Sequence, residues 1–246
     1  MQNITRIYAL SKRNVILRYK SSLVGFFWGF LKPLIYLLIF VVLFSTGTPH
    51  FVLYAMSGLI LWFFFSNVTG QTVGNIVGSA GLIKALNIPP IFFPLSEMLS
   101  ELFNLMLSLI IFGIVMHWFG LVYDLRLLLI VPCILLFAIF TFGLNLLLCS
   151  INVFFRDVGI IWGTIQPALF YLTPIAYPET LIAAKYKLII RCNPIYYFIK
   201  LGRDIFYSTE LPPLNLWRDC LIIAIAMYAI GFFVFNRLKK QFISAI

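Results

Sequence analysis

The chain has 246 residues, of which 62% are hydrophobic and only 11% are charged. Soluble domains average about 45–50% apolar and about 25% charged residues, so the composition excludes an ordinary soluble domain and indicates an integral membrane protein. The net charge is +10, but the cations flank apolar runs, a pattern typical of membrane topology rather than of nucleic-acid binding. We expect residues 1–246 to form a single all-α transmembrane domain.

Residues 1–22 predict an amphipathic helix that lies at the membrane surface. Arg6, Arg13 and Lys20 recur every seven residues and share one face, whereas Ile7 and other apolar residues lie on the opposite face. Basic helices of this kind lie in the plane of the membrane surface. The expected interfacial collar consists of Arg6, Arg13, Arg18 and Lys20. It anchors the topology, and contact with a cytoplasmic partner is an open alternative.

Six apolar runs are candidates for transmembrane helices. About 20 residues cross ~30 Å of hydrocarbon at 1.5 Å per residue. The spans are expected at about 23–45, 51–73, 95–117, 126–150, 158–176 and 217–236. The first run is too long for a signal-peptide core and is interpreted as a retained anchor, in which Pro33 is expected to introduce a kink.

The segments between the spans predict short helices and an orientation. Residues 75–94 have helical spacing that stops at Pro89-Pro90, and residues 177–216 hold short apolar pieces separated by prolines. The latter predict short re-entrant or gate helices between the fifth and sixth spans. Cations beside the first and last spans favour cytoplasmic positions for both termini.

Polar residues share one face of the third span, because Glu97, Glu101, Asn104 and Ser108 lie at helical spacing. The two glutamates could form a proton relay, but pairing with Lys84 or an N-terminal cation is the favoured interpretation.

Small residues and cysteines leave two structural questions open. Gly70, Gly74 and Gly78 recur every four residues, which permits the close approach of another helix. Cys192 and Cys220 are both expected outside, where a disulfide is one option.

The sequence contains no recognisable catalytic set. It has no GxxxxGK[ST] phosphate loop, so we expect no ATP hydrolysis by this chain, and no GxSxG motif is present. Its two histidines fall at span ends with no metal-ligand cluster around them, so neither a metal site nor catalytic residues are expected.

Three stretches carry a family resemblance: Arg18–Pro33 (RYKSSLVGFFWGFLKP), Asn152–Asp157 (NVFFRD), and Asn193–Phe198 (NPIYYF) with Arg203. Together they resemble the ABC-type polysaccharide export permeases, the membrane subunits of O-antigen, capsule and teichoic-acid exporters. The resemblance implies a homodimer in the bacterial cytoplasmic (inner) membrane with two copies of a separate nucleotide-binding ATPase subunit, which would carry ATP and Mg. It further implies export of an undecaprenyl-diphosphate-linked glycan.

In such permeases, short cytoplasmic helices transmit motion from the ATPase to the spans. The resemblance therefore assigns ATPase coupling or docking to residues in segments 75–88 and 152–157, namely Lys84, Leu86, Asn152, Arg156 and Asp157. Arg156 and Asp157 could also form a local ion pair at a helix start.

Aromatic rings offer flat surfaces that match the apolar C–H faces of sugars. The expected translocation path is lined by Tyr36, Trp62, Phe65 and Tyr171, although aromatics in membrane helices also pack against lipid. Outside, the cations form a basic zone that is either solvated or able to neutralise phosphates, and its members are Lys185, Lys187, Arg191, Lys200 and Arg203.

Two other functions fit the same sequence. One is a permease for a small drug or lipid, and the other is a membrane assembly protein without transport. The second would tolerate loss of Arg156 and Asp157.

Overall fold

The computed structural model describes residues 2–19, 25–44, 50–119, 124–175, 177–179, 182–207 and 210–245. Within these ranges every regular element is a helix, which confirms the all-α class. The α-helices are α1 (Gln2–Tyr19), α2 (Gly25–Phe44), α3 (Phe51–Thr72), α4 (Asn75–Gly78), α5 (Ala80–Leu86), α6 (Phe92–Trp118), α7 (Ile130–Phe154), α8 (Asp157–Leu172), α9 (Lys187–Arg191), α10 (Pro194–Tyr207), α11 (Leu214–Leu238) and α12 (Phe242–Ala245). Short 3-10 helices in the described ranges are η1 (Leu125–Leu129), η3 (Ala184–Tyr186) and η4 (Lys239–Gln241).

Four helical stretches among the described residues are long and apolar enough to cross a membrane. They are Phe51–Thr72, Phe92–Trp118, Leu125–Phe154 and Leu214–Ala245. The predicted first and fifth spans correspond to α2 and α8, and α8 has only 16 residues with Pro167 inside it. The six-span layout therefore stays a prediction.

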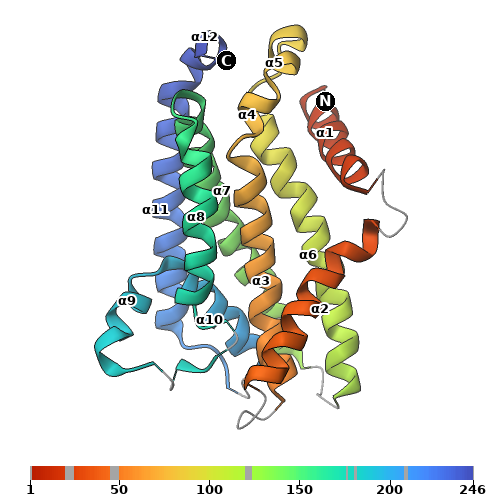
Figure 1. Ribbon diagram of the computed structural model, residues 1–246, viewed down its shortest axis with the longest axis vertical. Helices are drawn as coiled ribbons and strands as arrows, with labels where there is room; N and C mark the ends of the chain where they lie inside the picture. The colour runs from red at the N-terminus through yellow and green to blue at the C-terminus, as the bar shows by residue number, and fades with distance from the viewer. Residues whose placement is uncertain are drawn as a thin grey trace.

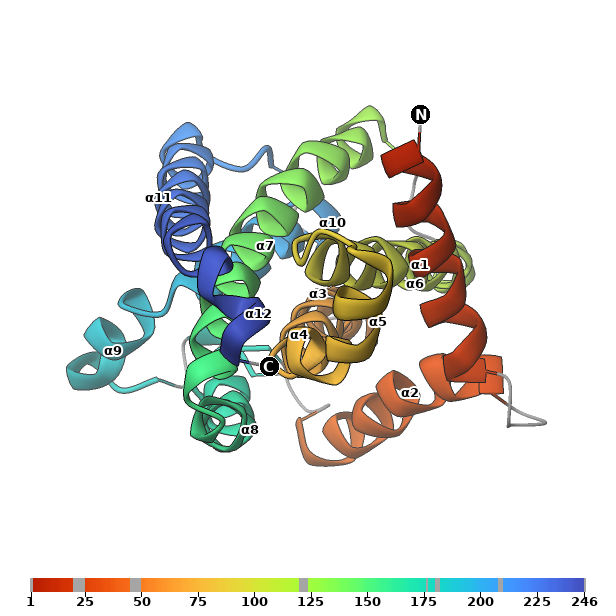
Figure 2. The ribbon, with the colours of Figure 1, turned by 90° about the horizontal axis from the view of Figure 1, so that it is seen from above.

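Helix α3 lies at the centre of the bundle, with α2, α6, α7, α8 and α10 packed around it (Figures 1 and 2). In the most apolar 18 residues of α3, 83% of the residues are buried, against 22% in Phe92–Trp118 and 17% in Leu214–Ala245. A helix that is apolar on all sides suits such a position, because every face meets another helix or lipid.

Helix boundaries follow local backbone chemistry. Asn87 ends α5 with φ 47°, the left-handed conformation common at helix C-termini, and His50 precedes α3 with φ 48°. Helix α6 begins at Phe92, three residues before the predicted span, because Pro89-Pro90 supply the turn that starts it.

Glycines bring α7 and α11 into close contact. A Cβ added at Gly231 would overlap the carbonyl oxygen of Gly143, and one added at Gly143 would lie 2.5 Å from the backbone of Tyr228. By contrast, a Cβ at Gly74 or Gly78 would meet nothing within 4 Å. The small-residue contact expected at these two glycines is therefore absent from the described part of the chain.

The two ends of the bundle differ. The chain termini, α1, α4, α5 and α12 lie at one end, the termini end, and α9 and α10 lie at the opposite end (Figure 1). An apolar cluster of described residues at the termini end joins seven helices, and its members include Leu10, Ile76, Ile83, Phe93, Val153, Phe235 and Phe242. Segments 75–88 and 152–157 thus share this end with the N-terminal helix.

The cysteines are free. Cys192 is exposed, whereas Cys220 is buried in α11. The structure therefore contains no disulfide between Cys192 and Cys220, the option that the sequence left open.

Candidate functional site

An aromatic pocket of about 220 Å³ lies between α2, α3 and α8. Its lining residues are Tyr36 from α2, Trp62, Phe63 and Ser66 from α3, and Gln166, Pro167, Phe170 and Tyr171 from α8. The structure therefore brings together three of the four residues predicted to line a path. None of the eight lining side chains is charged.

We call this pocket the path pocket, after the translocation path predicted from the sequence. The Phe170 ring contacts rings from both other helices of its wall. Its centroid lies 5.7 Å from Tyr36 at 87° and 5.3 Å from Trp62 at 58°. Tyr36 also meets Phe63 edge-on at 5.3 Å. Edge-to-face pairs of this kind favour one relative orientation of the rings, so the contacts within the pocket wall help to fix how α2, α3 and α8 pack against one another.

Gln166 adds a polar connection between α8 and α3. Its Nε2 donates to the Ser66 carbonyl oxygen at 2.7 Å and to Thr69 Oγ1 at 2.8 Å. Its neighbours in α8 are apolar, and an amide in such a helix needs a partner because hydrocarbon supplies none. A glutamine inside an apolar run was the available sequence signal, and it was missed.

Phe65, the fourth predicted path residue, lies elsewhere. It is fully buried and packs against Phe137 at 6.0 Å and Trp162 at 6.2 Å. Its side chain does not line the path pocket, because it points into the core between α3, α7 and α8.

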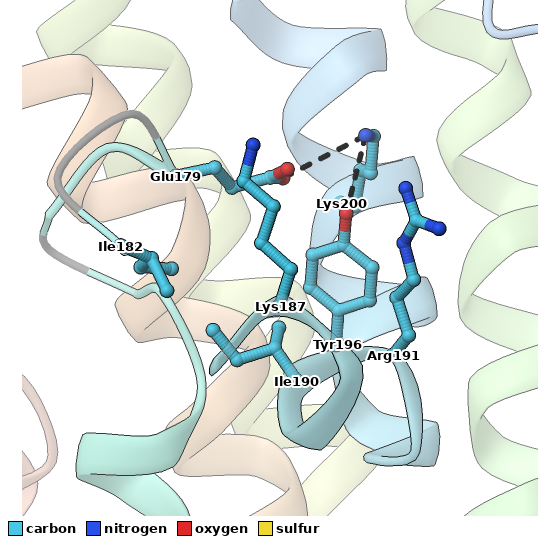
Figure 3. Close-up of a pocket in the computed structure, with 7 residues that line it drawn as sticks. All are labelled: Glu179, Ile182, Lys187, Ile190, Arg191, Tyr196 and Lys200. Carbon is cyan, nitrogen blue, oxygen red and sulfur yellow. Dashed lines mark hydrogen bonds and ion pairs between the residues drawn. The ribbon is translucent and has the colours of Figure 1, made fainter. Parts of the chain in front are cut away.

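At the opposite end of the bundle, Lys200 of α10 makes polar contacts with Tyr196 and Glu179 (Figure 3). Its Nζ donates to the Tyr196 hydroxyl at 3.2 Å and lies 3.6 Å from Glu179 Oε1. Burial would lower the pKa of Lys200, but the contacts with Tyr196 and Glu179 outweigh it and raise that pKa. The ammonium therefore stays charged over the physiological range.

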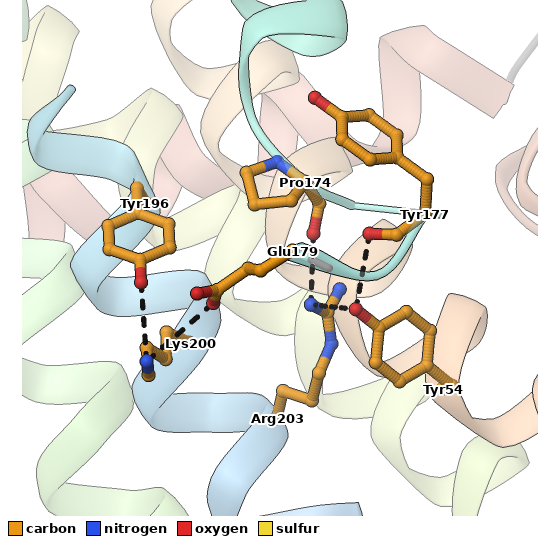
Figure 4. A network of polar contacts seen from close by, with 7 residues as sticks. All are labelled: Tyr54, Pro174, Tyr177, Glu179, Tyr196, Lys200 and Arg203. Carbon is orange, nitrogen blue, oxygen red and sulfur yellow. Dashed lines mark hydrogen bonds and ion pairs between the residues drawn. The ribbon is translucent and has the colours of Figure 1, made fainter. Parts of the chain in front are cut away.

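Arg203 forms a buried clamp one turn further along α10 (Figure 4). Its guanidinium lies over the Tyr54 ring, 3.8 Å from the centroid, and Nη1 donates to the Tyr54 hydroxyl at 2.8 Å. It also donates to the carbonyl oxygens of Pro174, at 2.9 Å, and Ile175. The Tyr54 hydroxyl in turn donates to the Tyr177 carbonyl oxygen at 3.2 Å.

This Arg203 clamp corrects the expectation that Arg203 belongs to the outer basic zone. The residue is only 7% exposed, and burial lowers the pKa of its guanidinium. Gly58 makes room for it, since a Cβ there would lie 2.8 Å from Arg203 Nη2. Because Pro174 follows Tyr171 closely in the chain, the clamp fixes the end of α8 that carries the path pocket.

The predicted coupling residues lie at the termini end. Asn152 is buried, and its Oδ1 accepts a hydrogen bond from the Gly159 backbone N–H at 3.0 Å, which ties the end of α7 to the first turn of α8. Lys84, Leu86, Arg156 and Asp157 are exposed on the surface of that end. The local ion pair between Arg156 and Asp157 is absent from the contacts of the described residues.

The collar helix α1 packs against α6 through polar contacts. Asn14 Nδ2 donates to Glu97 Oε2 at 2.9 Å, and the Ser100 hydroxyl donates to the Ser11 carbonyl oxygen at 3.1 Å. Glu101 accepts from Gln71 at 3.2 Å and from Asn104 at 3.2 Å. Both glutamates thus join helices together, because Glu97 of α6 bonds to Asn14 of α1 and Glu101 of α6 bonds to Gln71 of α3.

Of the collar cations, Arg6 and Arg13 are exposed on α1. The Arg18 side chain and the whole of Lys20 lie outside the described residues.

Comparison with known families decides the class. The sequence profile of the family described as "ABC-2 type transporter" matches residues 5–207, which include the path pocket, the Arg203 clamp and both coupling segments. The chain belongs to the ABC-2 type transporter family. Its similarity to individual members extends over nearly the whole length.

Among its relatives is the O-antigen export system permease protein RfbA of Klebsiella pneumoniae, 26% identical over 241 residues, with 96% of this chain and 93% of the relative covered. RfbA of Myxococcus xanthus is 26% identical over 246 residues, with coverages of 98% and 95%. The capsule polysaccharide export inner-membrane protein CtrC of Neisseria meningitidis is 29% identical over 168 residues, covering 65% and 63%. Those relatives are named as permeases or inner-membrane export proteins.

Among the residues that form the pocket and the clamp of this ABC-2 chain, the sequence singles out Tyr36, Trp62 and Tyr171 as a predicted path but does not indicate Gln166, Phe170 and Tyr54. Tyr54 sits in an apolar run, where a tyrosine is ordinary, and nothing local indicates that Arg203 will lie on its ring.

Proposed function

We propose that this chain is the membrane-spanning permease subunit of an ATP-driven exporter that moves a lipid-linked polysaccharide, such as an O-antigen, across the cytoplasmic membrane. The observation that carries this proposal is the path pocket, where aromatic rings and one amide form an uncharged wall. Such a wall offers stacking surfaces to sugar rings of many kinds without holding any unit tightly. The full-length similarity to O-antigen export permeases supports the same substrate class.

The proposed assembly is a homodimer with two copies of a nucleotide-binding ATPase subunit. The sequence has no phosphate loop, which supports the proposal that ATP and Mg bind to the partner subunit. The proposed substrate carrier is undecaprenyl diphosphate, and the proposed layout has six spans in the inner membrane with both termini in the cytoplasm. The cations of α1 and of the last turn of α11 support this orientation.

The coupling proposal uses the termini end of the bundle. Exposed Lys84, Leu86, Arg156 and Asp157 present a docking face, and the apolar cluster behind them connects α5 to the end of α7. A push on α5 or on the α7–α8 connection would reach α8 through the bond between Asn152 and Gly159. Helix α8 carries half of the path-pocket lining, so ATPase motion and path width are mechanically linked.

Purification of the tagged chain in mild detergent tests this function. We expect an equimolar companion with a phosphate-loop ATPase sequence, and accumulation of an unexported glycan in cells that lack the chain. Arg156→Ala is expected to keep the companion bound but to lower export, with Lys185→Ala as an exposed control away from the termini end. A chain that always purifies alone would contradict the proposal, and normal export by Arg156→Ala would contradict the coupling role.

Tyr171→Ala tests the path pocket. The Tyr171 side chain is 71% exposed and stacks edge-on with Phe170 at 5.3 Å, so its removal should leave the fold stable. We expect export to fall about twofold to tenfold, since one aromatic contact contributes roughly 0.5–1.5 kcal/mol. The measurement is the surface glycan per copy of complex.

The matched control for this test is Leu172→Ala, an adjacent residue of α8 that is 45% exposed and does not line the pocket. Equal export by the two variants would remove Tyr171 from the path.

A further inference from the structure

A polar groove lies at the end of the bundle opposite the termini, between α9, α10 and the start of α11. Two adjoining pockets of about 280 and 380 Å³ form it, and they share Arg191, Tyr196 and Lys200. Figure 3 shows the first of these pockets. Glu179 and Lys187 lie in the first pocket, and Asn215 and Asp219 lie in the second. We call this surface the outer groove.

Tyrosines give the outer groove an aromatic side. The Tyr196 and Tyr197 rings meet edge-on at 5.3 Å, and Lys200 Nζ lies 5.6 Å from the Tyr196 centroid. The Tyr197 hydroxyl donates to the Arg191 carbonyl oxygen at 3.0 Å, which holds the backbone of the Arg191 rim in place. A flat ring beside hydrogen-bonding groups suits one face of a sugar.

The charges of the outer groove are not balanced. The carboxylates on its wall already have partners, because Glu179 lies 3.6 Å from Lys200 and Asp219 lies 2.9 Å from Arg218. By contrast, no carboxylate of the described residues lies within ion-pair distance of Lys187 or Arg191. Two cations on the rim are thus available to an external anion.

The outer groove contrasts with the path pocket. The eight side chains of the path pocket carry no charge, whereas the outer groove has three cations and two carboxylates on its wall, a small excess of positive charge. A neutral polymer would not be attracted more strongly by the outer groove than by the uncharged path pocket. An anionic polymer would be attracted to the groove, because a cleft with an excess of charges of one sign concentrates the electrostatic field on a ligand of opposite sign.

We propose that the outer groove binds an acidic saccharide segment, a sugar ring beside a carboxylate or phosphate group, with Tyr196 against the ring and Lys187 and Arg191 on the anion. This proposal rests on the proposed export function and narrows its substrate class to a glycan that carries negative charge. Binding at this exposed groove is weak and salt-sensitive, because exposed charges are screened within about 10 Å at 0.1 M salt. Weak binding lets the polymer pass on.

Fluorescence binding to the purified complex with its ATPase companion, reconstituted in neutral phosphatidylcholine nanodiscs, tests this site. The probes are a labelled oligogalacturonate, which is acidic, and a labelled malto-oligosaccharide of equal length, which is neutral. We expect the acidic probe to bind more tightly than the neutral one. The double variant Lys187→Ala, Arg191→Ala should bind the acidic probe about fivefold more weakly, since two exposed charge contacts are lost.

The control is the charge-matched double variant Lys185→Ala, Lys240→Ala, whose exposed residues line neither pocket of the groove. Equal loss in both double variants, or equal binding of the acidic and neutral probes, would overturn the proposal.

A second arm separates glycan from lipid. In nanodiscs that contain phosphatidylglycerol, a double variant that loses bound lipid yet keeps the acidic probe would show that lipid phosphates occupy the groove, and the proposal would be wrong. Failure of the chain to hold an ATPase companion would instead contradict the proposed function, so the two failures are distinguishable.

Discussion

Replacing Gly231 with leucine is expected to prevent α7 and α11 from packing and to remove the folded protein from membranes. The Cβ of a side chain there overlaps the Gly143 carbonyl oxygen, and neither can move easily because each is fixed to a helix backbone. Overpacking a core costs about 1–3 kcal/mol when neighbours can shift, and more when they cannot. The measurement is the monodisperse peak of the detergent-solubilised chain in size-exclusion chromatography, followed by its melting temperature.

Gly113→Leu is the matched control, because a Cβ at Gly113 in α6 would meet nothing within 4 Å. We expect this variant to elute and melt close to the unsubstituted protein. A Gly231→Leu protein with the same elution and melting temperature as the control would show that α7 and α11 are not in close contact.

Replacing Arg203 with methionine is expected to release the connection between α10, α3 and the segment after α8. The substitution leaves the Tyr54 hydroxyl and the carbonyl oxygens of Pro174 and Ile175 without their donor. Each unsatisfied buried group costs about 1–3 kcal/mol, so the total loss is on the order of 3 kcal/mol or more. We expect a fall of several degrees in the melting temperature and loss of export.

Two further variants sharpen this test. Tyr54→Phe keeps the ring beneath the guanidinium and removes one hydroxyl, so a loss of about 1 kcal/mol is expected. Arg218→Met is the control, because its partner Asp219 is at the surface and an exposed pair contributes about 0–1 kcal/mol. Equal melting temperatures for Arg203→Met and Arg218→Met would refute the clamp.

The Arg203 clamp and the path pocket also explain each other's position. Phe170 and Tyr171 line the pocket, and the chain then turns through Pro174 and Ile175, whose carbonyl oxygens Arg203 holds. Aromatic groups contribute to a path only if their helix is fixed, since a loose wall has no defined width. The burial of Arg203 beside the segment that follows α8 therefore has a structural reason, whereas the exposed cations at this end of the bundle have none.

The sequence by itself determined the class of this protein. Composition and long apolar runs are local properties, and in hydrocarbon a backbone must satisfy its own hydrogen bonds, so an all-α membrane chain followed directly. Helical spacing of apolar residues and the Pro89-Pro90 stop predicted the helical segment within residues 75–94. The stretches Arg18–Pro33 and Asn152–Asp157 pointed to the polysaccharide export permeases, and the match to the ABC-2 family confirms that relationship.

Only the tertiary structure decided which side chains meet. Apolar faces on membrane helices look alike, because lipid and a neighbouring helix both accept them, so the rotation of each helix leaves little local trace. Gly74 and Gly78 had the expected spacing but face open space, whereas Gly143 and Gly231, far apart in the chain, make the close contact. Phe65 lies in the core, and Arg203 is buried against the ring of Tyr54 rather than exposed at the surface. Both positions depend on contact partners from other helices, which the local sequence does not reveal.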